Sequence, residues 1–109
     1  MAAFDSKQNG LSERLIKEII DLAQKFQIRK LILFGSRARG DYKKTSDIDF
    51  AVSGGNIVGF SIALEEEANT LLSFDVVNID QKVDTELLDS IKREGIIWYE
   101  EKGKLLSGT

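Results

Sequence analysis

The stretch Leu31–Val52 reads LILFGSRARGDYKKTSDIDFAV, and its pattern decides the fold. It begins with four apolar residues that stop at Gly35, which is typical of a short strand buried on both faces. A second apolar run, Phe50–Val52, ends the stretch. Because the polar link between the runs is short, we expect antiparallel neighbouring strands at about 30–34 and 47–53. A short helix should fold over the turn between them.

The turn after the first strand has the chemistry of an anion site. A strand that stops at Gly35-Ser36 and turns into a helix start offers backbone N–H groups and a hydroxyl to an anion. Arg37 and Arg39 follow, and either could hold phosphate oxygens or an acidic partner. They are two residues apart on a helix start and so do not share a face, which leaves open which one contacts phosphate. The plain alternative is an ordinary capped turn with solubilising arginines.

A pair of aspartates marks the start of the second strand. Alternate strand residues point the same way, so Asp47 and Asp49 should share one face while Ile48 and Phe50 point into the core. Two like charges this close repel each other unless a cation lies between them. Carboxylate oxygens favour a hard divalent cation such as Mg²⁺, with Mn²⁺ as an alternative.

A third aspartate lies within a later apolar segment, Phe74–Ile79, that reads as a strand. A carboxylate inside an apolar strand costs several kcal/mol unless it is paired or bound to a metal. Asp75 is therefore a candidate metal ligand, and the alternative is a strand-end aspartate that accepts backbone N–H bonds. Asp80 competes with it, but polar residues follow Asp80, and we interpret it as a turn residue.

The rest of the chain alternates helices with strands. Helical periodicity predicts helices over 13–27, with Ser12 as the N-cap, over 60–72 with Leu71 facing inward, and over 85–94 with Asp84 as the N-cap. The residues after Gly95 should form an edge strand. We expect a single α/β (α+β) domain over 12–100, with a mixed sheet of about four strands covered by helices. Flexible ends are expected at 1–11 and 101–109.

Composition limits the chemistry. The 109 residues contain no cysteine and no histidine, so a catalytic site would depend on carboxylates, metal ions and backbone groups. The net charge of −3 argues against general nucleic-acid binding. No apolar run has the length of a membrane span and the first residues lack a signal-peptide core, which predicts a cytoplasmic protein.

The spacing of these motifs resembles a known signature. Gly-Ser followed after ten residues by Asp-x-Asp is similar to the signature of the nucleotidyltransferase superfamily that includes DNA polymerase beta. The short form, GSRARG and then SDIDF, looks most like the minimal nucleotidyltransferases, the partners of HEPN-domain ribonucleases in prokaryotic toxin–antitoxin pairs. The resemblance covers roughly residues 12–100.

The resemblance implies a set of site residues. Asp47, Asp49 and Asp75 would hold two Mg²⁺ ions for in-line displacement at phosphorus. The nucleotide would be ATP or another nucleoside triphosphate, bound by the following residues: Gly35, Ser36, Arg37 and Arg39. Gly40 matches the second glycine of the family's turn, where its role is conformational.

The function implied is a Mg²⁺-dependent nucleotidyltransferase that moves AMP from ATP to a hydroxyl of a partner protein. In the family, the partner is a HEPN ribonuclease toxin, which is silenced when its tyrosine receives AMP, so the chain would be an antitoxin. The alternative is a non-catalytic antitoxin that neutralises its partner by contact alone. Transfer to RNA ends or to a small molecule is a weaker third reading. The sequence leaves open the nucleotide, the acceptor residue and the oligomeric state, a homo-oligomer included.

Overall fold

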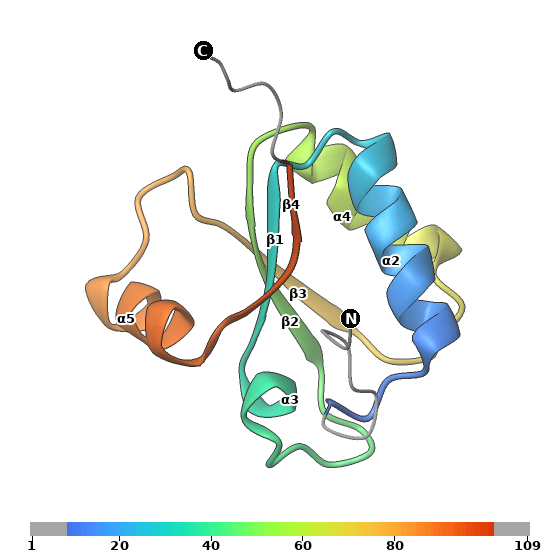
Figure 1. Cartoon of the computed structure of the whole chain (residues 1–109), viewed down its shortest axis with the longest axis horizontal. Coiled ribbons are helices and arrows are strands. Elements are labelled where there is room, and N and C mark those ends of the chain that lie inside the picture. The colour runs from blue at the N-terminus through green and yellow to red at the C-terminus, as the bar shows by residue number, and fades with distance from the viewer. Residues whose placement is uncertain (1–8, 102–109) are drawn as a thin grey trace.

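Four strands form one mixed sheet in the computed structural model, which describes residues 9–101 (Figure 1). They are β1 (Lys30–Phe34), β2 (Ile48–Ser53), β3 (Phe74–Asn78) and β4 (Ile96–Glu100), in the spatial order β3-β2-β1-β4. β1 pairs antiparallel with both β2 and β4, whereas β2 and β3 are parallel. The predicted mixed sheet, its antiparallel first pair and its last strand at an edge are thus confirmed.

Helices cover both faces of this sheet. α2 (Glu13–Lys25) and α4 (Ile57–Glu67) lie on one face, α5 (Thr85–Glu94) lies on the other, and the short α3 (Ser36–Arg39) follows β1 directly (Figure 1). The α+β class is confirmed. Within residues 9–101, no helix has the length and apolar character that would let it cross a membrane.

The first helix forms because its cap and its apolar face agree. The Ser12 hydroxyl accepts a hydrogen bond from the backbone N–H of Leu15 at 3.1 Å, as an N-cap should. The helix ends at Lys25, two residues earlier than predicted, because Gln27 adopts a positive φ of 61°. Its buried residues are Leu15, Ile16, Ile19, Leu22 and Ala23.

Two apolar clusters lie on opposite faces of the sheet. The larger one, beneath α2 and α4, is centred on Phe50, whose ring stacks near Phe74 and meets Trp98 edge-on at a centroid distance of 5.2 Å. The smaller cluster, beneath α5, consists of Ile32, Phe34, Ala51 and Ile91. Strand residues therefore alternate between the two clusters, and this alternation fixes where the strand aspartates point.

The second long helix lies earlier in the chain than predicted. α4 begins after Asn56, whose side chain accepts a hydrogen bond from Gly59 N–H at 3.0 Å, and it ends at Glu67. The prediction of a helix over 60–72 was therefore wrong at both ends. Leu71 lies in the loop that follows and is fully exposed, so its predicted inward orientation was also wrong. Asp84 occupies the N-cap position of α5 but its side chain makes no capping hydrogen bond.

The ordered chain begins before residue 12. Asn9 and Leu11, which the sequence assigned to a flexible end, are buried, and Leu11 belongs to the main core. The remainder of that predicted end, residues 1–8, lies outside the described residues, as does 102–109 of the predicted C-terminal tail.

Candidate active site at one end of the sheet

Two of the aspartates predicted from the sequence, Asp49 and Asp75, lie side by side on the face of the sheet that carries α5. Residues of β2 and β3 pair in parallel so that Asp49 lies directly beside Asp75. The residues on either side of Asp49, Ile48 and Phe50, are fully buried in the main core, so the Asp49 side chain lies on the opposite face. Asp47 immediately precedes β2. The parallel register thus joins two parts of the sequence that lie 26 residues apart.

The three carboxylates differ in their access to solvent. Asp47 and Asp75 are exposed, and Asp49 is half-buried. The desolvation argument that the sequence suggested for Asp75 therefore does not apply. What distinguishes Asp75 in the structure is its place beside Asp49 rather than its burial.

Asp49 is the electrostatic centre of the group. Burial raises the pKa of the Asp49 carboxyl to about 6, and the negative charges of Asp75 and Asp47 add to this increase. The Arg39 guanidinium acts in the opposite direction and lowers the pKa of the same carboxyl. Asp49 therefore shares one electrostatic neighbourhood with two carboxylates and one arginine, assembled from β2, β3 and α3.

The donor chemistry of this group fits a hard divalent cation. Carboxylate oxygens are the ligands that Mg²⁺ prefers. Over residues 9–101, no three acidic, histidine or cysteine side chains lie close enough together to form a metal site as they stand. Like charges on neighbouring carboxylates repel each other, and a cation between them would offset that repulsion.

The turn between β1 and α3 lies against Asp49. The last residue of β1, Phe34, pairs with Asp49 across the antiparallel ladder, so Gly35 follows directly beside the carboxylate. Gly35 has φ 79° and ψ −159°, a conformation that side-chain-bearing residues rarely adopt. A Cβ atom at this position would collide with the Asp49 carboxylate. The glycine thus allows the turn and the aspartate to touch.

The rest of the turn is a single helical turn closed by a second glycine. Ser36 opens α3, and its carbonyl oxygen accepts hydrogen bonds from the backbone N–H groups of Gly40 at 2.8 Å and Asp41 at 3.1 Å. Gly40 is left-handed, with φ 95° and ψ 1°, which confirms its predicted conformational role. The first backbone amides of α3 have no intrahelical acceptor, as at any helix start.

Arg37 is part of the fold rather than of an open anion site. Its side chain is 2% exposed, and its guanidinium donates to the carbonyl oxygens of Asn9 at 2.9 Å and Ser46 at 3.1 Å. It also lies over the Tyr42 ring, 4.9 Å from the centroid. Longer hydrogen bonds reach the carbonyl oxygens of Lys43 and Lys44. Arg37 could reach a phosphate only by giving up these bonds, and its predicted contact with a nucleotide stays a prediction.

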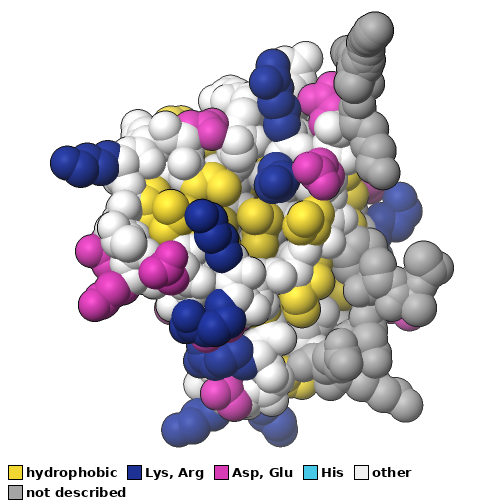
Figure 2. Space-filling view, turned by 60° about the vertical axis from the view of Figure 1, so that its left-hand side comes forward, with side chains coloured by type: hydrophobic (Ala, Val, Ile, Leu, Met, Phe, Trp, Pro, Cys, Tyr) yellow, Lys and Arg dark blue, Asp and Glu magenta, His cyan; other side chains and the backbone are white. Residues whose placement is uncertain are grey.

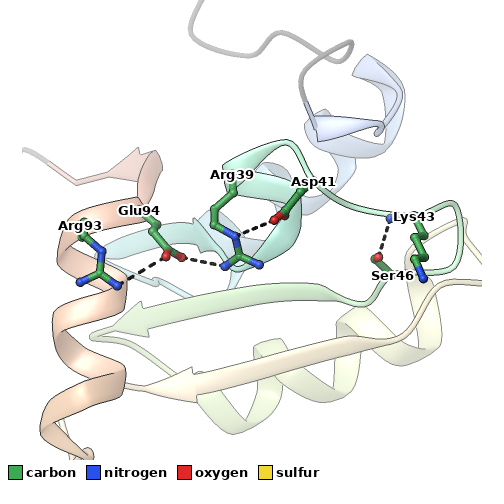
Figure 3. Close-up of polar contacts among 6 residues, drawn as sticks. All are labelled: Arg39, Asp41, Lys43, Ser46, Arg93 and Glu94. Carbon is green, nitrogen blue, oxygen red and sulfur yellow. Dashed lines mark hydrogen bonds and ion pairs between the residues drawn. The ribbon is translucent and has the colours of Figure 1, made fainter.

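Arg39, unlike Arg37, faces solvent, and it lies near the Asp49 carboxylate. Its side chain is 43% exposed and forms ion pairs with Asp41 at 3.3 Å and Glu94 at 3.0 Å (Figure 3). These hydrogen bonds raise the pKa of Arg39, Asp41 contributing most. Glu94, the last residue of α5, was not identified from the sequence. No local pattern marks it, because its link to Arg39 spans 55 residues.

Asp80 lies at the opposite end of β2 and has a different role. Its carboxylate accepts hydrogen bonds from the Ser53 hydroxyl and the Gly54 backbone N–H, both at 2.7 Å. These bonds lower the pKa of the Asp80 carboxyl. The interpretation of Asp80 as a turn residue is confirmed, and its register places it away from Asp49.

The surface on the α5 side of the molecule interleaves both signs of charge. Figure 2 shows basic side chains gathered next to acidic ones, beside a band of apolar side chains. The partly buried apolar residues Val77, Ile79 and Leu87 pack against the smaller core on this side. An anion approaching this face would therefore meet local attraction at the basic cluster rather than a uniformly positive surface.

Comparison with known proteins identifies relatives of this domain. A family model described as polymerase beta, nucleotidyltransferase matches residues 17–104. A protein of Methanocaldococcus jannaschii named "Putative protein adenylyltransferase" is 43% identical over 68 residues. That match covers 60% of this chain and 66% of the relative, so it spans just under two thirds of the relative's length.

Solved structures share the fold. A crystal structure of a toxin–antitoxin with AMP-PNP matches with a TM-score of 0.65 at 21% identity, covering 80% of this chain and 74% of that chain. At this identity the likeness establishes the fold alone. A crystal structure of a "putative nucleotidyltransferase" from Sulfolobus solfataricus matches with a TM-score of 0.50 at 26% identity, covering 85% of this chain and 86% of that chain.

Proposed function

This chain belongs to the polymerase beta nucleotidyltransferase family, and on that premise we propose that it transfers AMP from ATP to a hydroxyl group of a partner protein. The partner we propose is a HEPN-domain ribonuclease toxin, with this chain as its antitoxin. A protein acceptor is supported by the name of the M. jannaschii relative. The ribonuclease partner rests on the resemblance of the GSRARG and SDIDF motifs.

One observation carries the proposal: the turn at Gly35 is in contact with Asp49, the aspartate that lies beside Asp75. A triphosphate at the start of α3 would therefore have its phosphorus atoms next to carboxylates that can hold neutralising cations. The turn alone would offer only phosphate contacts, and the aspartates alone would offer only cation ligands.

Each residue has a distinct role in this proposal. Gly35 lets the backbone approach the phosphates, and Ser36 supplies a hydroxyl and an amide. Arg39 donates to phosphate oxygens, while Arg37 holds the loop in place. Asp47, Asp49 and Asp75 bind divalent cations.

The chemistry is a displacement at phosphorus. The acceptor oxygen forms a bond to the α-phosphorus, the bond between the α-phosphorus and the bridging oxygen to the β-phosphate breaks, and pyrophosphate leaves. The acceptor hydroxyl loses its proton to solvent. Bound Mg²⁺ would neutralise the triphosphate and make the acceptor hydroxyl more acidic. Because the chain contains no histidine, the proposed reaction relies on carboxylates and cations.

The test compares the wild type with an Asp47→Asn, Asp49→Asn double variant. Each is mixed with the candidate ribonuclease, ATP and Mg²⁺, and intact-mass spectrometry looks for added AMP on the ribonuclease. Loss of these ligands should lower the transfer rate by about a thousandfold or more, several kcal/mol of transition-state stabilisation. Asp80→Asn is the matched control, since it removes a carboxylate at the far end of the same sheet and should leave transfer intact.

The rival function is inhibition by contact without chemistry. The ribonuclease activity is therefore measured after each variant has been removed from the mixture. Lasting inhibition with added AMP, seen with the wild type and the Asp80 variant only, supports the transferase. Equal and durable inhibition by the double variant, with no added mass in any sample, would establish the contact inhibitor instead.

A further inference from the structure

Arg39 is held from two sides by carboxylates that come from different parts of the chain. Its Nη1 donates to Glu94 Oε1 at 3.0 Å, and its Nε donates to Asp41 Oδ2 at 3.3 Å (Figure 3). Asp41 follows α3 on the same loop, whereas Glu94 ends α5 on the face of the sheet next to the carboxylates. The guanidinium thus bridges two elements that flank the site.

Glu94 is the more firmly placed of the two acceptors. Its side chain is 18% exposed, compared with 64% for Asp41. Its other oxygen, Oε2, lies 3.6 Å from Arg93 Nη2, but Arg93 is 66% exposed and this longer ion pair adds little to the placement of Glu94. The helix behind it is anchored in the smaller core by Ile91, which is 4% exposed. Glu94 therefore offers Arg39 an acceptor on a rigid element, whereas Asp41 belongs to an exposed loop.

The pattern of hydrogen bonds leaves one edge of the guanidinium available. Among the described residues, the hydrogen bonds of Arg39 use Nε and one proton of Nη1. An arginine carries five N–H donors in a planar fork, so the Nη2 group and the second Nη1 proton can donate elsewhere. A free arginine side chain loses about 2 kcal/mol of conformational freedom when it is fixed, and a pre-formed ion pair meets part of this cost before a ligand arrives.

We propose that Glu94 is a positioning residue that fixes Arg39 with its free N–H edge toward the triphosphate of the bound nucleotide. This inference rests on the proposed function, because it takes a nucleoside triphosphate as the ligand of the turn. It assigns Glu94 no contact with the nucleotide itself. Without Glu94, Arg39 would sample several rotamers beside the site and would bind phosphate less often in the productive orientation.

The test measures the dissociation constant of ATP by calorimetry in the presence of Mg²⁺. Glu94→Ala should weaken ATP binding by about fivefold, which corresponds to about 1 kcal/mol. Glu94→Gln should stay within about threefold of the wild type, because its amide oxygen can still accept from Arg39. Arg93→Ala is the matched control: it removes the other cation on Glu94, leaves the Arg39 contact in place and should not change ATP affinity.

A double-mutant cycle separates positioning from a general structural effect. If Glu94 acts through Arg39, Glu94→Ala should have no further effect on ATP affinity in an Arg39→Ala background. Melting temperatures are recorded for every variant. An equal loss of affinity in both backgrounds would overturn the inference, and so would unchanged or tighter ATP binding by Glu94→Ala, since the last result would show that Glu94 competes with phosphate.

The two proposals fail in different ways. If the wild type binds ATP and modifies its partner but Glu94→Ala binds ATP equally well, the positioning role alone is refuted. If the wild type does not bind ATP with Mg²⁺ present, both the proposed function and the positioning role are refuted.

Discussion

Replacing Arg37 by methionine should destabilise the domain without acting directly on nucleotide binding. The substitution keeps an unbranched apolar stem and removes the guanidinium. The Asn9 carbonyl oxygen, which accepts a buried hydrogen bond of 2.9 Å from Arg37, would lose that partner. The Ser46 carbonyl oxygen would lose two donors, at 3.2 and 3.1 Å, in a partly buried position.

The size of the effect follows from these contacts. A buried polar group left without a partner costs about 1–3 kcal/mol, and a hydrogen bond from a charged donor contributes about 1.5–3 kcal/mol. Water can reach the partly buried carbonyl, so we count one full loss and one reduced one, about 3 kcal/mol in total. For a domain of this size the melting temperature should fall by roughly 15 °C.

The measurement pairs thermal unfolding with ATP titration. Arg39→Met serves as the control, because its ion pairs are exposed and such pairs contribute about 0–1 kcal/mol. We expect Arg39→Met to melt within a few degrees of the wild type and to bind ATP weakly. Arg37→Met should melt far lower and, at a temperature where it is folded, bind ATP much as the wild type does. The opposite pattern would refute the assignment of Arg37 to the fold.

Three further perturbations test the same site and its surroundings. Gly35→Ala should lower both the melting temperature and ATP affinity, because its Cβ meets Asp49. Gly54→Ala, at another glycine with positive φ (80°), should lower the melting temperature alone, and equal ATP affinity in the two variants would contradict the role of the Gly35 turn. In EDTA, Asp49 stays protonated up to about pH 6 in the folded state but only to about pH 4 when unfolded, so the free energy of unfolding should fall as pH rises through this window. Urea titrations should show that Asp49→Asn flattens this dependence of the free energy of unfolding on pH. Asp80 has a lowered pKa when folded, so Asp80→Asn should lower the melting temperature at pH 7 and converge with the wild type as pH falls below about 4; a difference that persists in acid would show that its charge is not responsible.

The parts of the fold that the sequence predicts are those set by local pattern. Apolar runs that end at Gly35 and after Val52 identify β1 and β2, and the short link between them dictates antiparallel pairing. The alternation around Ile48 and Phe50 sets the face on which Asp49 lies, and the structure keeps it. These features can be predicted without knowing any distant contact, because the alternation of apolar residues and the length of the link between the strands determine them.

The errors arise where a helix boundary depends on competing signals. Residues 60–72 carry apolar side chains at helical spacing as far as Leu71, so periodicity alone extends the helix too far. The structure instead starts α4 at the Asn56 cap and ends it at Glu67, and the residues beyond it form a loop. Periodicity records which residues can face a core, but a cap decides where the helix starts.

The two arginines could not be told apart from the sequence. Both lie on the same helical turn, and their roles depend on what other segments bring to them. The chain before Leu11 and the loop at 43–46 supply carbonyl oxygens to Arg37, while α5 supplies Glu94 to Arg39. These partners lie up to 55 residues away, and a single sequence carries no signal of that distance.

The fold acts in opposite directions on the charges of Asp49 and Asp80. Both carboxylates lie at an end of β2, yet Asp80 accepts two hydrogen bonds that lower the pKa of its carboxyl, whereas Asp49 lies beside a second carboxylate and has its pKa raised to about 6. At neutral pH the ionised Asp80 stabilises the turn around it, while ionised Asp49 weakens the fold that holds it. A binder that acts by contact alone gains nothing from the charge of Asp49. An enzyme that holds cations recovers the free energy that ionised Asp49 costs the fold when metal and nucleotide bind. For this reason, Mg²⁺ with ATP should raise the melting temperature of the wild type and have almost no effect on the Asp47→Asn, Asp49→Asn variant, and an equal rise in both would contradict the proposed site.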